Sequence, residues 1–326
     1  MFEINKRNAR MWSRIGARAF YGQAISALAQ QNDNIIALSA DLGRSSGLSR
    51  FADDHPDQFI NTGIAEQNLV GFSAGLARMG FDVFSSTFAP FASLRAGEQV
   101  RMNMGYMHEP VKLVALGSGL AMAFLGNSHY GLEDVAVMRT VPDLTIISPA
   151  DCAEIYKTLH ACVGFPHPVY IRLTGAIGLP VVYEDDYDFR IGRGVWLRPA
   201  QDVTLVAAGS TVGHCLKAAA ELEEQGLSVG LLNMHTIKPL DAEAIVACVG
   251  TARQIYVIDE HTRIGGLGSA VLDHINEHHW DYQGRVFIHG IDDRYVETGS
   301  YPFLLERNGL DAAGIAAFVR QRTEAA

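Results

Sequence analysis

The sequence predicts an α/β protein made of two doubly wound domains with mostly parallel sheets, at residues 1–190 and 195–326. Short continuous apolar runs, which are typical of strands buried on both faces, alternate with helical patterns along the whole chain. The alternation stops at 178–202, where turn residues and charges replace any helical pattern, and then restarts. A length of 326 residues also suggests two domains, at roughly 100–200 residues each.

Each domain has its own set of predicted elements. In the first domain, strands are expected at 34–40, 111–117, 144–150 and 168–174, with a short strand-like segment before Phe88. Its helical patterns cover roughly 14–30, 66–79, 91–104, 132–140 and 151–163. In the second domain, strands are expected at 203–209, 228–233, 254–260 and 285–290. Its helices are expected at 211–225, 241–249, 266–278 and 311–323.

The composition excludes several classes of function. A net charge of −10 argues against a general nucleic-acid-binding protein. The basic cluster in the first twenty residues, which ends at Arg18, has the pattern of a solvated helix face. The four cysteines form no C-x-x-C motif, so neither disulfides nor a thiolate zinc site is expected. Without an apolar signal segment or a run of roughly 18 apolar residues, the sequence predicts a cytoplasmic protein.

The common metal-binding and nucleotide-binding motifs are missing. The segment "AAGSTVG" (207–213) follows a strand and begins a helix, so its amides could hold an anion. Neither this segment nor "GGLGSAV" (265–271) has the G-x-G-x-x-G spacing, and a tight turn is the simpler interpretation. The chain contains no H-E-x-x-H metal motif.

A single acid, Glu66, begins the apolar helical pattern at 66–79, and Phe88 and Phe91 follow it. Taken alone, Glu66 could be a first-turn acid that is stabilised by the helix dipole, and the two phenylalanines could belong to the core. The order of several segments favours a different interpretation of these residues.

Six segments resemble the transketolase family, and they occur in the family's order. They are "LSADLGRSSG" (38–47), "INTGIAEQNLVGFSAGLA" (60–77), "SSTFAPFAS" (85–93), "GNSHYGLEDVAVMRTVPDLTIISPAD" (126–151), "PVYIRLTG" (168–175) and "TIKPLD" (236–241). The resemblance covers nearly the whole chain. It implies a pyrimidine-binding domain, of the fold that binds thiamin diphosphate, followed by the transketolase C-terminal domain.

This resemblance implies that thiamin diphosphate is the cofactor and that Glu66 hydrogen-bonds its pyrimidine ring. The imino tautomer then removes the thiazolium C2 proton, and the resulting carbanion attacks a ketose carbonyl. A two-carbon ketol unit passes to an aldehyde acceptor. Desolvation in an apolar pocket favours the protonated form of a carboxyl group, so such a group can share a proton with a ring nitrogen.

The same resemblance assigns further residues to the site. Phe91 would stack on the pyrimidine, and the pocket would be completed by Phe88 and Leu94. Asp41 would lie on the thiazolium side of the cofactor, and His129 near the reacting centre, unless it is a core histidine. The residues expected to hold a substrate phosphate are Arg18, Ser45 and Arg172, because a guanidinium can pair bidentately with phosphate oxygens.

Two departures from the family concern the substrate. Gly117 stands where the family usually has a histidine, and Leu125 where it usually has an acid. Both family residues contact the substrate. We therefore expect an unusual ketose that is branched, deoxygenated or otherwise modified, with an anionic group at its end.

The family's G-D-G motif, which binds magnesium and the cofactor's diphosphate, does not occur in the sequence. We therefore expect this chain to be the C-terminal half of a split transketolase. The partner would be an N-terminal subunit that carries the G-D-G motif and the Mg²⁺ ligands, and the assembly would be a heterotetramer with two copies of each chain.

Two alternatives remain. The chain could be a β subunit of a 2-oxo acid dehydrogenase or a related decarboxylating enzyme, or a non-catalytic half that serves assembly or regulation. The sequence identifies neither the donor ketose nor the acceptor, and interface packing is expected for His261 and the "GGLG" turn.

Overall fold

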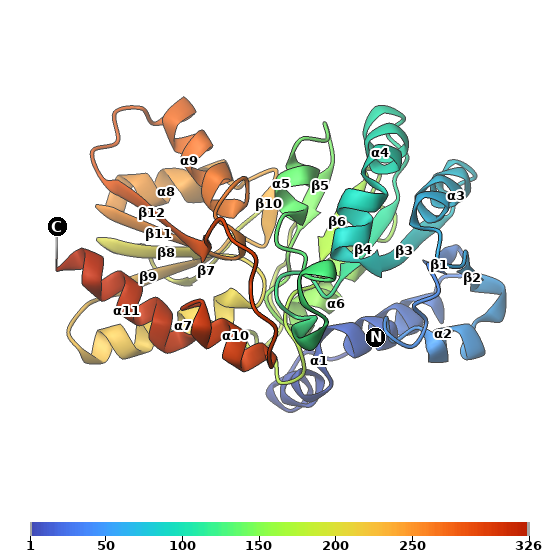
Figure 1. Ribbon diagram of the computed structural model, residues 1–326, viewed down its shortest axis with the longest axis horizontal. Coiled ribbons are helices and arrows are strands. Elements are labelled where there is room, and N and C mark those ends of the chain that lie inside the picture. Colours follow the sequence, from blue (N-terminus) through green and yellow to red (C-terminus); the bar gives the residue numbers. More distant parts are fainter. Residues whose placement is uncertain (1, 325–326) are drawn as a thin grey trace.

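The computed structural model describes residues 2–324, which form two sheets side by side (Figure 1). The first sheet contains β1 (Ile35–Ser39), β2 (Phe59–Asn61), β3 (Asp82–Phe88), β4 (Lys112–Leu116), β5 (Thr145–Ile147), β6 (Val169–Arg172) and β10 (Thr236–Lys238). Its order is β10-β5-β6-β4-β3-β1-β2. All neighbouring strands in it are parallel except β10, which pairs antiparallel with β5.

The second sheet contains β7 (Val195–Arg198), β8 (Val203–Ala207), β9 (Val229–Asn233), β11 (Gln254–Thr262) and β12 (Arg285–Ile291). Its order is β12-β11-β8-β9-β7, and only the edge strand β7 is antiparallel to its neighbour. The prediction of two α/β units with mostly parallel sheets is therefore confirmed.

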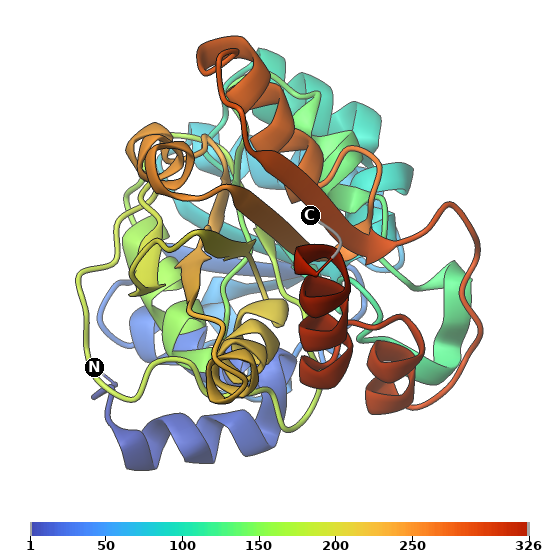
Figure 2. The ribbon, with the colours of Figure 1, turned by 90° about the vertical axis from the view of Figure 1, so that its left-hand side faces the viewer.

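Helices cover both faces of both sheets (Figures 1 and 2). The helices of the first half are α1 (Lys6–Ala29), α2 (Ser49–Asp54), α3 (Glu66–Arg78), α4 (Gly97–Gln99), α5 (Asp134–Arg139) and α6 (Cys152–Cys162). Those of the second half are α7 (Thr211–Glu224), α8 (Ala242–Thr251), α9 (Leu267–His278), α10 (Tyr301–Arg307) and α11 (Ala312–Thr323). No helix among the described residues is long and apolar enough to cross a bilayer.

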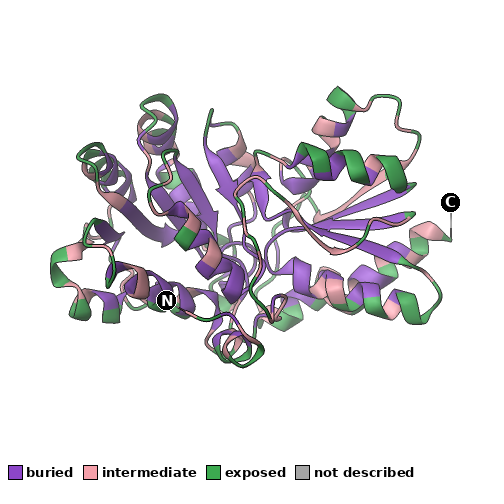
Figure 3. Cartoon of the chain, turned by 180° about the vertical axis from the view of Figure 1, so that it is seen from behind, coloured by how far each residue is buried: buried purple, intermediate pink, exposed green. Residues whose placement is uncertain are grey.

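The cores of the two halves are continuous. One apolar cluster joins α1 and α6 to α7 and α11 on one face of the sheets, and a second joins α3 to α8 and α9 on the other. The central strands between them are almost entirely buried, whereas the edge strands β2, β7 and β12 are mostly half-buried (Figure 3). Several helices begin at an acidic or amide side chain that accepts a backbone N–H, for example Asn5 at α1 and Asp151 at α6.

One predicted element was wrong, and some short strands were not predicted. The pattern at 91–104 is not one helix, because π-helical turns at Phe91–Arg95 and Val100–Tyr106 flank α4. The break at 178–202 contains strand β7, and the short segment of β10 leaves the second half to join the first sheet. Strands of three or four residues are too short to show a clear alternation of apolar and polar residues in the sequence.

Arg172 joins the two halves at the end of β6. Its side chain is completely buried, and its Nε lies 3.0 Å from Oδ2 of Asp134. Its Nη2 donates to the backbone carbonyls of Gly131 and, in the second half, Glu260, at 3.1 and 2.8 Å. Burial opposes the charged form, but the carboxylates of Asp134 and Asp259 outweigh it and raise the pKa of Arg172. The expectation that Arg172 holds a substrate phosphate is corrected, because this guanidinium is enclosed and already paired.

We expect Arg172→Met to destabilise the protein strongly. Removing one partner of a buried ion pair leaves the other charge uncompensated, which costs about 3–5 kcal/mol. Urea denaturation of the purified chain would measure the loss. Arg50→Met is the matched control, because Arg50 forms an exposed pair with Asp54 within α2 and such a pair contributes only about 0.3–0.5 kcal/mol. Similar losses in both variants would contradict the structural role of Arg172.

Candidate functional site

The predicted site residues follow the carboxyl ends of strands in the first sheet, which is where open α/β sheets bind ligands. Asp41 follows β1, Glu66 follows β2, and Phe91 follows β3. His129 comes after β4, at the end of a long loop. The parallel strand order therefore brings residues from distant parts of the sequence to one edge.

Glu66 is the first residue of α3 and is only 3% exposed. Its Oε1 accepts a hydrogen bond from Nη1 of Arg95, at 2.9 Å. This arginine supplies the countercharge that a buried carboxylate needs. The first turn of α3 has no side-chain cap, so the position of Glu66 depends on tertiary contacts.

Three rings form an aromatic wall beside Glu66, at the ends of β3 and of the loop after β4. The ring centroids of Phe88 and Phe91 are 6.0 Å apart, and His129 lies 5.8 Å from Phe88 and 5.5 Å from Phe91. All three pairs meet edge to face. The Nδ1 atom of His129 lies 2.9 Å from the hydroxyl of Ser128. The structure thus brings together three residues that the sequence predicted for one site.

A π-helical turn shapes the wall. The backbone N–H of Ala96 donates to the carbonyl of Phe91, five residues earlier, at 3.0 Å. Within this turn the guanidinium carbon of Arg95 lies 4.1 Å from the centroid of the Phe91 ring, over its face. Leu94, predicted to complete the pocket, is 54% exposed in the same turn. π-Helical turns occur often at functional sites.

The residues at this edge fit the pyrimidine half of thiamin diphosphate. A planar guanidinium already rests on Phe91 while it donates to the Glu66 carboxylate. An aminopyrimidine is also planar and offers ring and amino nitrogens, so it can make the same two contacts. Sequence reasoning missed Arg95, although its spacing of four residues from Phe91 could have pointed to it.

A second cavity, of about 340 Å³, lies where α1 meets the loops after β1 and β6. Its lining includes Arg18, Arg44 and Ser45. Gly16, at φ 79°, interrupts α1 so that the helix restarts just before Arg18, whose Nη1 lies 3.5 Å from the carbonyl oxygen of Ser45. Burial lowers the pKa of Arg18, and no carboxylate among the described residues offsets that cost. The cavity therefore suits an anion, and Arg44 is a cation that sequence reasoning missed.

Asp41 follows β1, at the start of the loop that leads to Arg44 and Ser45. It is exposed, has a φ of 57°, and exchanges two hydrogen bonds of 3.0 Å with the side chain of Asn61 at the end of β2. Asn61 also accepts from the backbone of Gly63, three residues before Glu66. Asp41 therefore helps to fix the loop that leads to the carboxylate.

The second half of the chain positions the loop that carries His129. Oε1 of Glu260, at the end of β11, accepts the backbone N–H of Leu120 at 2.6 Å. The other oxygen of Glu260 accepts from Ser210 and Tyr301, and burial raises the pKa of this carboxyl group. His261, next in the chain, is fully buried and lies 3.8 Å from Asp134. The sequence did not reveal the positioning role of Glu260.

The two departures from the family pattern lie in the same loop. Gly117 has a φ of 63°, and a Cβ atom there would lie 2.3 Å from the sulfur of Met122. Met122 therefore fills the space into which a larger side chain at 117 would extend. Leu125 is 53% exposed, and its neighbour Phe124 is 74% exposed. The loop thus presents apolar groups near His129.

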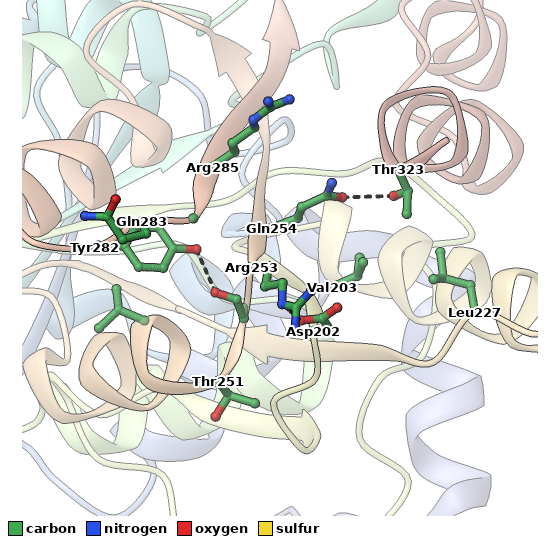
Figure 4. A pocket seen from close by; sticks show the side chains of 13 residues that line it. Asp202, Val203, Leu227, Thr251, Arg253, Gln254, Tyr282, Gln283, Arg285 and Thr323 are labelled. Carbon is green, nitrogen blue, oxygen red and sulfur yellow. Dashed lines mark hydrogen bonds and ion pairs between the residues drawn. The ribbon is translucent and has the colours of Figure 1, made fainter. Parts of the chain in front are cut away.

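A larger cavity, of about 690 Å³, lies elsewhere (Figure 4). It is at the amino ends of β8, β11 and β12, and its rim includes the Arg253–Asp202 pair. Tyr282 closes one side by donating to the carbonyl of Ala252 at 2.8 Å. Ligands of doubly wound sheets bind at the opposite, carboxyl ends. Because of this location, we do not assign the active site to this cavity, although it is large.

Comparison with known proteins agrees with this geometry. The family described as "Transketolase, pyrimidine binding domain" matches residues 13–176, and "Transketolase, C-terminal domain" matches residues 192–315. A subunit of the apulose-4-phosphate transketolase of Phocaeicola vulgatus is 38% identical over 302 residues, which are 92% of this chain and 95% of the relative.

Two further proteins are similar over almost their whole length. A 6-deoxy-6-sulfo-D-fructose transketolase subunit from a Clostridium species is 35% identical, over 94% of each chain. A solved structure described as a split-gene transketolase in an inactive β4 tetramer is 39% identical, with a TM-score of 0.84 over 93% of this chain and 97% of that one. The chain therefore belongs to the transketolase family, in which it corresponds to the C-terminal half of a split enzyme.

Proposed function

We propose that this chain is the C-terminal subunit of a thiamin diphosphate-dependent transketolase that transfers a two-carbon ketol unit from an anionic ketose to an aldehyde. The observation that carries the proposal is the buried Glu66 carboxylate beside the face of Phe91, with a planar nitrogen group bound to both. The alternative of a 2-oxo acid dehydrogenase subunit is not favoured, because two relatives that match this chain over almost their own whole length are named as transketolase subunits.

Each residue of the site has a role in this reaction. Bound thiamin diphosphate would supply the nucleophilic carbon that accepts the two-carbon unit. Glu66 would share a proton with a pyrimidine nitrogen, a role that needs a carboxyl group shielded from water. Phe91 and Phe88 would orient the ring, and His129, in contact with both, would hold or move a proton on a substrate hydroxyl.

The site needs a partner subunit to be complete. Among residues 2–324, no three His, Cys, Asp or Glu side chains lie together so that they could hold a metal ion. The Mg²⁺ ion and the cofactor's diphosphate are therefore assigned to an N-terminal subunit that carries a G-D-G motif, in an assembly of two copies of each chain. The related β4 tetramer that is described as inactive supports this assignment.

The cavity at Arg18 supports an anionic substrate. Arg18 and Arg44 can bind a phosphate or sulfonate through charge-assisted hydrogen bonds. Near His129, Met122 and Leu125 offer no hydrogen bond to a sugar hydroxyl, which favours a deoxygenated or branched chain. The names of the two relatives specify a sugar phosphate and a sulfonated deoxy sugar, which agrees with both features.

Glu66→Gln should lower kcat by about 10²–10⁴-fold, because an amide cannot share the proton and general acid–base contributions have this size. Steady-state kinetics of the complex assembled with the partner subunit would measure the loss. The thermal unfolding midpoint should stay near that of the parent, which separates chemistry from folding. Activity within twofold of the parent would refute the role of Glu66.

The chain alone should be inactive, since the ligands for the diphosphate and Mg²⁺ are expected on the partner. Adding the partner, thiamin diphosphate and Mg²⁺ should restore turnover, and removing the metal with a chelator should abolish it. Turnover of a panel of sugar phosphates and sugar sulfonates would be the measurement. A purified single chain with full activity would exclude the split-enzyme proposal.

Arg44→Met should raise KM for an anionic ketose or acceptor by about 10-fold, because a hydrogen bond to a charged group contributes roughly 1.5–3 kcal/mol. KM for the small neutral acceptor glycolaldehyde should not change. Arg18→Met should behave in the same way with a larger effect, since Arg18 is more deeply buried. Equal changes for charged and neutral substrates would show that the cavity does not hold the anion.

A further inference from the structure

Arg95 makes the two contacts that the proposed cofactor requires. Its Nη1 donates to Oε1 of Glu66 at 2.9 Å, and its guanidinium carbon lies 4.1 Å above the centre of Phe91. The other two rings of the wall, Phe88 and His129, meet Phe91 edge to face and leave this face to the arginine. Among the described residues, Arg95 is thus the cation that holds both key groups.

The electrostatics explain why a cation lies there. The Glu66 side chain is 4% exposed, and a buried carboxylate without a partner is strongly destabilising. Arg95 neutralises this charge, and its planar group stacks on Phe91 at little cost because guanidinium is weakly hydrated. In the subunit without cofactor, the arginine therefore stabilises a site that would otherwise be a buried, unpaired charge.

Arg95 and the pyrimidine ring cannot occupy the same place. Both are planar, and in the proposed complex the pyrimidine would need the face of Phe91 and the Glu66 carboxylate that Arg95 now contacts. Nearly half of the Arg95 side chain, 47%, is already exposed, so it can swing outward without breaking the core. The other arginine of this region, Arg101, is paired with Glu98 at 2.9 Å and is not bound to Glu66.

We propose that Arg95 is a placeholder for the cofactor's pyrimidine, and that thiamin diphosphate must displace it to bind; this inference rests on the proposed function. Arg95 then acts as a positioning residue that prepares Glu66 but competes with the cofactor. Only the fraction of molecules with Arg95 displaced can bind, so the apparent affinity is reduced by that fraction. Until thiamin diphosphate binds, Arg95 thereby covers the face of Phe91 and balances the charge of Glu66.

The test is cofactor binding to the assembled enzyme, measured by isothermal titration calorimetry with thiamin diphosphate and Mg²⁺. Arg95→Met keeps an unbranched apolar stem but removes the charge and the planar group. We expect this variant to bind thiamin diphosphate about 10-fold more tightly, as the competing state is lost. Arg101→Met is the matched control, and its dissociation constant should equal that of the parent.

A second measurement distinguishes competition between Arg95 and thiamin diphosphate from a general change in the structure of the site. In a Glu66→Gln background the ion pair is already absent, so Arg95→Met should tighten binding by less than it does in the parent. If Arg95→Met does not fold, Arg95→Lys can be measured instead, since it keeps a countercharge but lacks the planar group. We expect it to bind thiamin diphosphate more tightly than the parent, though less tightly than Arg95→Met.

The outcomes distinguish this inference from the proposed function. Equal affinity of the parent and the Arg95 variants, or weaker binding by those variants, would overturn the placeholder role and leave the transketolase proposal intact. If no variant and no parent complex binds thiamin diphosphate, the proposed function fails and the inference fails with it. Tighter binding by the Arg95 variants alone, with Arg101→Met unchanged, would establish the competition.

Discussion

The buried guanidinium of Arg172 holds the two halves of this protein in register, because it pairs with Asp134 in the first half and donates to the backbone of Glu260 in the second. A guanidinium with no contact to water must satisfy its charge and its N–H groups inside the protein, and here the carbonyl of Glu260 contributes from the second half. Any shift between the halves would break these contacts. The same segment of β11 then reaches Leu120 through the Glu260 side chain. The second domain therefore fixes the loop that places His129, although it contributes no residue to the aromatic wall.

A second constraint is the charge of Glu66. The role that we propose for Glu66 needs a carboxyl group away from water, but burial without a partner would destabilise the fold. The structure meets both requirements with one half-exposed countercharge, Arg95, on a π-helical turn. Around this pocket the chain leaves Leu94 and Phe124 exposed. Such an arrangement is reasonable for half of a site whose remaining part comes from another polypeptide.

The region that we propose for the substrate has a cationic part around Arg18 and an apolar part near His129. Around Arg18 the cavity has cations that lack a carboxylate partner among the residues that line it. Near His129, by contrast, Met122 takes the space beside Gly117, and Leu125 offers only apolar surface. A long anionic substrate with few hydroxyl groups along its chain would satisfy both regions. Polar groups with no hydrogen-bonding partner would be disfavoured in the apolar part.

The sequence by itself determined the fold class and the central residues of the candidate site. Continuous apolar runs such as Ile35–Ser39 indicate buried parallel strands, and the order of motifs around Glu66, Phe91 and His129 indicated a shared site. These features are local, so a pattern of residue types is enough to reveal them. Their placement at one edge then follows from the parallel strand order, which brings the carboxyl ends of β2, β3 and β4 together.

Only the tertiary structure decided which charges meet. Arg172 looked like a phosphate ligand in the sequence, but it is paired with Asp134, 38 positions away, and with the backbone of Glu260, 88 positions away. Arg95 meets Glu66 across 29 positions, and Arg44 joins Arg18 in one cavity through the crossing of α1 over a loop. A charged side chain carries no periodic signal of its partner, because its energy depends on burial and on the geometry of distant groups.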